Sequence, residues 1–100
     1  MRPTTPIAAR PLVWHDLAAM LTGLQMRAAR ALLRWSHQKL ADESGIGIAT
    51  IQRAEGEDGV PGVQARTLNA IQTTLERAGI IFLDPGRNED GGPGVRLKKS

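Results

Sequence analysis

The order of apolar and polar residues predicts four helices followed by a short β-hairpin. Between residues 22 and 79, apolar side chains recur at intervals of three and four, as on one face of a helix. The first helix is predicted from Thr22, its N-cap, to about Leu33, because Thr22 and Gln25 have the spacing of a capping box. The apolar residues at helical spacing in this segment, which we expect to face the core, are Leu24, Ala28, Ala31, Leu32 and Trp35.

Two shorter helices are predicted next. Ser36 is placed to cap the segment HQKLADES, which ends at Gly45 because glycine readily takes the left-handed conformation that follows a last helical turn. A third helix is expected from about Gly47 to Glu55, before the loop GEDGVPG. The residues of these helices expected to face inward are Leu40, Ala41, Ile51 and Ala54.

A fourth helix and two strands complete the predicted fold. The segment RTLNAIQTTLERAG predicts a helix that stops at Gly79. Its apolar residues at helical spacing are Leu68, Ile71, Leu75 and Ala78. The run IIFLD has the length and β-branched composition of a strand, and VRLKK is its candidate hairpin partner. The expected fold class is therefore mainly α, with about four helices and a C-terminal β-hairpin.

Three regions are expected along the chain. Residues 1–19 hold three Pro in the first eleven positions and show no clear helical period, so they are predicted to be a flexible N-terminal extension. Residues 20–79 are predicted to form a single helical domain, and residues 80–100 the strand, hairpin and basic tail.

The composition limits the chemistry of the chain. With no Cys there is no thiolate metal site, and the two His residues lack a carboxylate at ligand spacing, so we expect neither a metal nor a cofactor. No Ser, His and acid stand in a triad pattern, and an enzyme is not expected. No apolar run approaches the ~20 residues of a membrane span. The absence of Cys fits a reducing compartment, and a cytoplasmic location is expected.

The charge balance is mildly basic. Thirteen Lys and Arg stand against ten Asp and Glu, a net charge of +3, and residues 1–35 hold five Arg and one Asp. A basic excess is common in nucleic-acid-binding proteins, but basic chain ends give the same balance. Charge alone therefore leaves the partner open.

The two short helices joined through Gly45 outline a helix-turn-helix. Ala41, Gly45 and Ile51 follow one another at intervals of four and six, and each has a steric reason. A small residue is needed where the helices cross, glycine makes the turn, and the Ile51 side chain fills the space between the helices. The capped first helix and Glu55 before a Gly-rich loop strengthen this pattern.

With these residues the chain resembles the Xre-type, lambda-repressor-like helix-turn-helix family. The resemblance lies in LTGLQMRAARALLRWSHQKLADESGIGIATIQRAE and RTLNAIQTTLERAGIIFL and covers about residues 20–97. It implies a sequence-specific transcriptional regulator, most often a repressor, that binds double-stranded DNA as a homodimer. The third helix enters the major groove and the second crosses the phosphate backbone. An alternative hypothesis is a protein-interaction module, such as an antitoxin-like partner, that uses the C-terminal strand.

The resemblance also assigns site residues. It places His37 and Gln38 at the backbone-contacting start of the second helix, although family members usually carry Gln where this chain has His37. The positions of the third helix that match the family's DNA contacts are Ile48, Ala49, Thr50, Gln52 and Arg53. Gln52 is suited to adenine, Arg53 to guanine, and Ile48 and Ala49 to thymine methyl groups. The alternatives are an exposed His37 without a partner, a core Ile48 and a merely solvated Arg53.

Two further assignments concern the structure of the domain. Arg30 and Glu55 match positions where the family carries an ion pair between the first and third helices, and the alternative is two independent surface charges. The candidate dimer-interface residues are Ile80, Ile81, Phe82 and Leu83. Both faces of that strand are apolar, so pairing with a second copy would cover one of them. The alternative is a hairpin covered on both faces by its own helices.

We expect that deletion of Met1 to Ala19 leaves the melting temperature nearly unchanged, because little of that segment has the pattern of a packed element. Thermal melts of the full chain and of residues 20–100, followed by circular dichroism, test this. A drop of several degrees would contradict it and would assign Leu12, Val13, Trp14 and Leu17 to an additional core helix.

Overall fold

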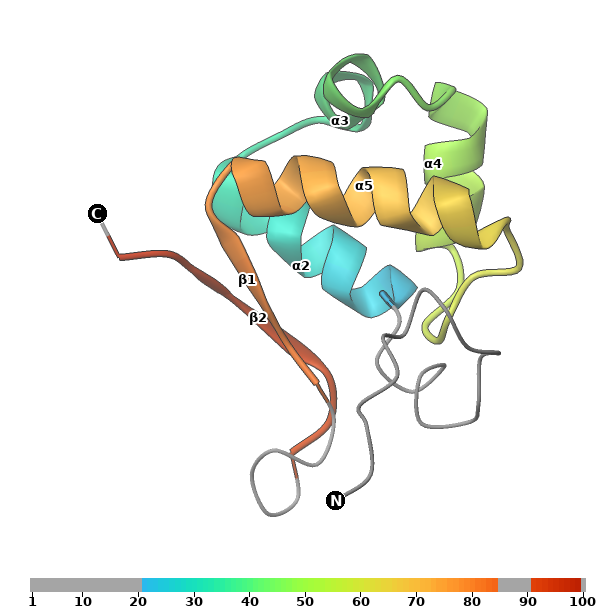
Figure 1. The fold of residues 1–100 in the computed structure, drawn as a ribbon. Helices are drawn as coiled ribbons and strands as arrows, with labels where there is room; N and C mark the ends of the chain where they lie inside the picture. Colours follow the sequence, from blue (N-terminus) through green and yellow to red (C-terminus); the bar gives the residue numbers. More distant parts are fainter. Residues whose placement is uncertain (1–20, 85–90, 100) are drawn as a thin grey trace, which may run out of the picture.

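The computed structural model describes residues 21–84 and 91–99, which fold into four helices and a two-stranded antiparallel hairpin (Figure 1). The elements are α2 (Gly23–Leu33), α3 (His37–Ser44), α4 (Ile48–Glu55), α5 (Ala65–Arg77), β1 (Ile80–Leu83) and β2 (Gly94–Leu97). In Figure 1, α3 lies above α5, α4 lies toward the right-hand end of α5, and the hairpin runs downward from the left-hand end of α5. The mainly helical class with a C-terminal hairpin is confirmed, while the predicted extension, residues 1–19, lies outside the described residues.

The predicted capping box at the start of α2 is confirmed. The Gln25 backbone N–H donates to Thr22 Oγ1 at 3.1 Å, and the Thr22 backbone N–H donates to Gln25 Oε1 at 3.0 Å. The other end of the Gln25 amide reaches the hairpin, where Nε2 donates to the carbonyl oxygens of Leu83 at 3.3 Å and Gly94 at 3.0 Å. One buried side chain therefore caps α2 and holds the hairpin against it.

The α3 and α4 helices begin and end as the sequence predicts. Ser36 Oγ accepts the Lys39 backbone N–H at 3.0 Å and caps α3, which stops at Gly45 with a left-handed φ of 74°. Gly47 stands at the N-cap of α4 without a side-chain hydrogen bond. The two helices pack against each other through the buried side chains of Leu40, Ala41, Ile51 and Ala54.

The hairpin follows α5 directly. Gly79 has a φ of 109°, a conformation that glycine adopts without steric cost, and it turns the chain from α5 into β1. The strands pair antiparallel in the register Ile80 with Leu97, Ile81 with Arg96, Phe82 with Val95 and Leu83 with Gly94. Ile80 is buried, and Phe82 and Val95 pack against the helical core. One face of the hairpin is thus covered by its own monomer.

The core lies where α2, α3, α4, α5 and β1 meet, and it is built from aliphatic residues. Its buried members are Leu21, Met26, Ala29, Leu40, Ala41, Ile51, Ala54, Leu68, Ile71, Leu75 and Ile80. The predicted inward faces of α3 and α4 are confirmed, as are Leu68, Ile71 and Leu75 on α5; Ala78 is half-buried.

The predicted core face of α2 is wrong, except at Trp35, which packs against the core. Leu24 and Leu32 are 47% and 44% exposed, and Ala28 and Ala31 are exposed as well. The inward residues are instead Met26 and Ala29, with Leu33 and Trp35 packed at the edge of the core. Apolar residues lie on both sides of this helix, so its periodicity alone cannot select the buried side. Contacts made by its first turn, at Gly23 and Gln25, fix the rotation.

The contact at Gly23 is close. Its backbone N–H donates to the Gly59 carbonyl at 2.9 Å, and a Cβ at this position would lie 1.7 Å from the Glu57 carbonyl oxygen and 2.8 Å from that of Ala54. These neighbours are backbone atoms, which cannot move aside as a side-chain tip can. The end of α4 and the loop after it therefore meet α2 at a position that admits glycine alone.

We expect Gly23→Ala to lower the free energy of unfolding by about 2 kcal/mol or more, because the added methyl overlaps backbone oxygens. The matched control is Gly59→Ala, where a Cβ meets nothing within 4 Å. Urea unfolding of both variants measures the effect. Equal stability of Gly23→Ala and the parent chain would show that α2 and the end of α4 are not in this close contact.

Candidate nucleic-acid interface

The outward face of α4 carries the residues predicted to contact DNA. Ala49, Gln52 and Arg53 are exposed, Ile48 is 37% exposed and Thr50 is half-buried. Ile51, Ala54 and Glu55 occupy the inner face. Ile48 is therefore on the surface and not in the core, and the five predicted positions lie along the solvent-facing part of one helix.

Gln52 and Arg53 are available for contacts outside the monomer. Neither side chain makes a hydrogen bond or ion pair with another residue in the described part of the chain, in which Arg27, Arg30, Lys39 and Arg66 do so. Within residues 21–84 and 91–99, their donors are thus not used for contacts between helices. A glutamine and an arginine next to each other on an exposed helix are suited to the edges of bases in a groove.

The start of α3 differs from the prediction. His37 is neither a side chain without a partner nor directed wholly at solvent, because its Nε2 lies 3.2 Å from Glu55 Oε1. Gln38 is exposed and its Nε2 donates to Asp42 Oδ1 at 2.8 Å, one turn along the same helix. His37 therefore links the first turn of α3 to the end of α4, a contact that the sequence analysis did not predict.

The predicted ion pair between Arg30 and Glu55 is present. Arg30 Nε and Nη2 donate to the two oxygens of the Glu55 carboxylate at 2.7 and 2.8 Å, and Arg30 Nη1 donates to the Trp35 carbonyl at 2.8 Å. The Glu55 side chain is 3% exposed and that of Arg30 is 18% exposed. We call Arg30, His37 and Glu55 together the Glu55 cluster. It joins α2, α3 and α4 through one carboxylate.

The electrostatics of the Glu55 cluster follow from its geometry. The hydrogen bonds to Glu55 raise the pKa of the Arg30 guanidinium above its ordinary value, the partial burial of Arg30 opposes this, and the Coulomb attraction of the carboxylate adds to it. Arg30 stays charged at every working pH, so the buried carboxylate always has a cation beside it. Two parallel N–H donors also fix the orientation of the carboxylate, as a single lysine ammonium would not.

A second arginine of α2 holds the same end of α4. Arg27 donates from Nη1 to the Glu55 carbonyl oxygen and from Nη2 to Asp58 Oδ1 at 2.8 Å. This role of Arg27 was not predicted from the sequence. The available signal was the spacing of three between Arg27 and Arg30, which places both side chains on the same side of α2.

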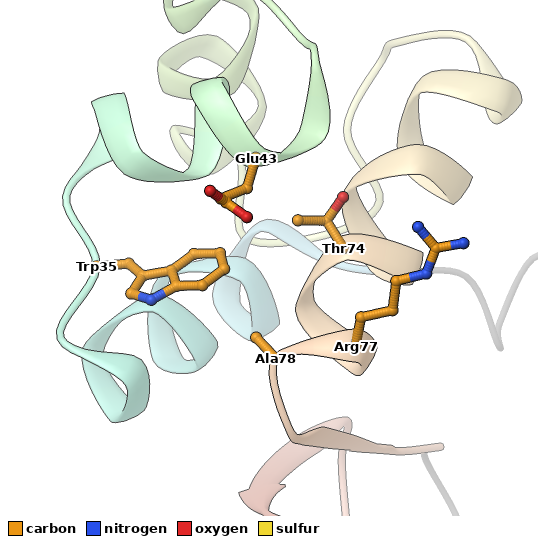
Figure 2. A pocket seen from close by; sticks show the side chains of 5 residues that line it. All are labelled: Trp35, Glu43, Thr74, Arg77 and Ala78. Atoms are coloured by element: carbon orange, nitrogen blue, oxygen red, sulfur yellow. The ribbon is translucent and has the colours of Figure 1, made fainter.

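A shallow cleft of about 230 Å³ lies between α3 and the C-terminal end of α5, away from α4. Figure 2 shows Trp35, Glu43, Thr74, Arg77 and Ala78 around it. Glu43 pairs with Lys39 Nζ at 3.3 Å, and Thr74 Oγ1 donates to the Ala70 carbonyl. The charged groups of this cleft are at the surface, and the contacts that some of them make are local helix contacts of modest strength.

We also searched the described residues for a metal site and for a membrane-spanning helix. Among residues 21–84 and 91–99, no group of three His, Cys, Asp or Glu side chains is arranged to hold a metal ion. No helix within the described residues is long and apolar enough to cross a membrane. No protein-family model and no curated protein sequence matches the chain.

We expect Glu55→Gln to lower the free energy of unfolding by about 3 kcal/mol, because it leaves the half-buried Arg30 guanidinium without a counter-charge. The matched control is Glu43→Gln, which breaks an exposed i,i+4 pair on α3 and should cost less than about 0.5 kcal/mol.

Urea unfolding of both variants and of Arg30→Ala gives the comparison, and a double-mutant cycle between Arg30 and Glu55 gives their coupling. Equal effects of the two Glu→Gln changes, or a coupling within error of zero, would show that Glu55 does not join the helices as the distances indicate.

Proposed function

We propose that this chain is a sequence-specific, duplex-DNA-binding transcriptional regulator of the lambda-repressor-like helix-turn-helix type. The observation that carries the proposal is the exposed face of α4, where the side chains of Gln52 and Arg53 make no hydrogen bond or ion pair with other described residues. The helix follows α3 across the left-handed Gly45 turn. The family resemblance of residues 20–97 supports the same function.

In this proposal α4 enters the major groove. The Gln52 side-chain amide donates a hydrogen bond to the edge of an adenine and accepts one from it. The N–H groups of Arg53 donate two hydrogen bonds to a guanine. Ile48 and Ala49, at the first turn of α4, pack on thymine methyl groups, and the Thr50 hydroxyl donates to a phosphate. The site therefore combines two hydrogen-bonding contacts to bases and one to phosphate with an apolar patch that favours A·T pairs.

The Glu55 cluster sets the angle at which α4 is presented. The carboxylate of Glu55 ends α4 and is held by Arg30 of α2 and His37 of α3. Base-edge recognition requires side chains to stay within fractions of an ångström of a bonding position, and rigid elements achieve this better than loops. Without the cluster, only the apolar packing between α3 and α4 would hold α4 in its orientation.

The first turn of α3 is the proposed backbone contact. Gln38 is exposed there, and the N–H groups of a helix N-terminus favour phosphate oxygens. His37 donates to Glu55 in the free protein, so its contribution in the complex is to position this turn. This modifies the expectation that His37 itself contacts phosphate.

The alternative hypothesis, a protein-interaction module, has one observation in its favour. Ile81 and Leu83 lie on the face of β1 opposite to the core-packed Phe82, and both are half-exposed. Of the four residues predicted for a strand interface, these two remain on the surface, whereas Ile80 is 3% exposed. In that case binding to a protein partner depends on Ile81 and Leu83 and not on α4.

We expect affinity for duplex DNA to fall steeply with salt, since phosphate contacts release counterions. Arg53→Ala should reduce discrimination at one base step by about 1 to 3 kcal/mol. Arg77→Ala, at the far end of α5, removes the same charge away from α4 and is the matched control.

A selection from random duplexes followed by titrations at two salt concentrations measures both effects. Equal weakening of all sequences by Arg53→Ala would make Arg53 a phosphate contact. No binding to any duplex at low salt would overturn the proposed function, and a partner captured through Ile81 and Leu83 would favour the alternative.

A further inference from the structure

The outward side of α2 is an uncharged apolar face. It consists of Leu24, Ala28, Ala31 and Leu32, all exposed, and we call it the α2 face. The residues are spaced at i, i+4, i+7 and i+8, so they form one stripe along the helix. A single exposed leucine needs no explanation, but a contiguous apolar stripe without any charged residue is typical of a contact surface.

Other exposed apolar residues gather beside this face. Five large hydrophobic residues in the described part of the chain are well exposed: Leu24, Leu32, Ile48, Val60 and Leu97. Ile48 belongs to the proposed DNA-reading surface. Two of the other four lie on α2, and Leu97 lies on β2, which packs against α2. The exposure is therefore concentrated on the α2 side of the molecule and is not scattered.

The order of large and small residues on the α2 face is self-complementary. Consider a two-fold axis that passes between two copies of α2 beside Ala28 and is perpendicular to both helices. It sets the two helices antiparallel. Leu24 then faces the partner's Leu32, and Leu32 faces the partner's Leu24, while Ala28 meets its own copy. Alanines at the centre let the helix axes approach to about 8 Å, the close end of the usual range. We propose that the α2 face is the docking site for a second copy of this chain.

Charges at the two ends of α2 fit the same arrangement. Arg34 is exposed at the C-terminal end, and Asp58, 79% exposed, is held beside the N-terminal half by Arg27. Positions 27 and 34 are seven apart, so Arg34 and the Arg27–Asp58 pair lie on the same flank of the helix. The two-fold axis brings Arg34 of one copy toward the partner's Asp58. Arg34 thus meets a carboxylate that already pairs with Arg27, and its attraction to Asp58 is modest because these charges are exposed.

The size of the surface indicates how strong the dimer is. A standard interface buries about 800 Å² on each partner. The eleven residues of α2 span about 16 Å and supply part of that area. The same axis places both hairpins on the flank opposite to Arg34, where Leu97, 50% exposed, extends the contact. A second copy therefore docks through α2 and β2 together, independently of whether the chain binds DNA.

A single cysteine tests the axis directly. The chain contains no Cys, so Ala28→Cys introduces one thiol at the point where the two copies meet. We expect oxidation to convert the full-length variant to a covalent dimer at least ten times faster than Asn69→Cys, which places a thiol on an exposed residue of α5, outside the α2 face.

Sedimentation equilibrium of the full chain without DNA gives the second test. Leu32→Glu should raise the dimer dissociation constant at least tenfold, and Arg34→Glu should raise it less. Asn69→Glu, which adds the same charge at an exposed residue of α5, should leave it unchanged. Circular dichroism checks that each variant is folded.

Three results would overturn the inference. The first is a folded parent chain that stays monomeric at about 100 μM. The second is equal cross-linking of the two cysteine variants. The third is a monomer whose melting temperature falls with Leu32→Glu, which would assign the α2 face to a segment of the same chain. Because the tests contain no DNA, their failure leaves the proposed function standing, and loss of DNA binding leaves the dimer standing.

Discussion

The Glu55 carboxylate lies out of water at the end of α4, and the arrangement of α2, α3 and α4 depends on how its charge is neutralised. Arg30 from α2 supplies two parallel donors, and His37 from α3 lies within hydrogen-bond distance of one carboxylate oxygen. Arg27 donates a hydrogen bond to the Glu55 backbone carbonyl oxygen. A buried carboxylate without partners has a large desolvation cost. The arrangement of α2, α3 and α4 therefore requires these partners.

Local signals in the sequence predicted the helix boundaries well. The capping box at Thr22, the Ser36 cap and the Gly45 stop each involve neighbours within a few residues, and each is present in the structure. The rotation of α2 could not be predicted in this way. Its two sides are both rich in Leu and Ala, and the choice between them is made by distant backbone, above all by the loop carbonyls that face Gly23.

In the candidate site, too, some residues could be predicted from the sequence and others could not. The exposed positions of α4 and the Arg30–Glu55 pair could be proposed from sequence, because a short helix has few possible outward faces and the family resemblance supplied the pair. The contacts of His37 and Arg27 depend on how three helices meet, and no pattern within one helix encodes them. The exposed α2 face was missed for a related reason: its residues were expected to be core.

The amide of Gln25 also has a consequence for motion. Its oxygen accepts the Thr22 N–H at the start of α2, and its nitrogen donates to Leu83 and Gly94, 58 and 69 positions away in the chain. If the hairpin detaches, that nitrogen loses both acceptors, and the amide is then free to leave the cap. The first turn of α2 and the hairpin therefore form one cooperative opening unit. Their backbone amide protons should exchange with solvent together, although they belong to opposite ends of the described chain.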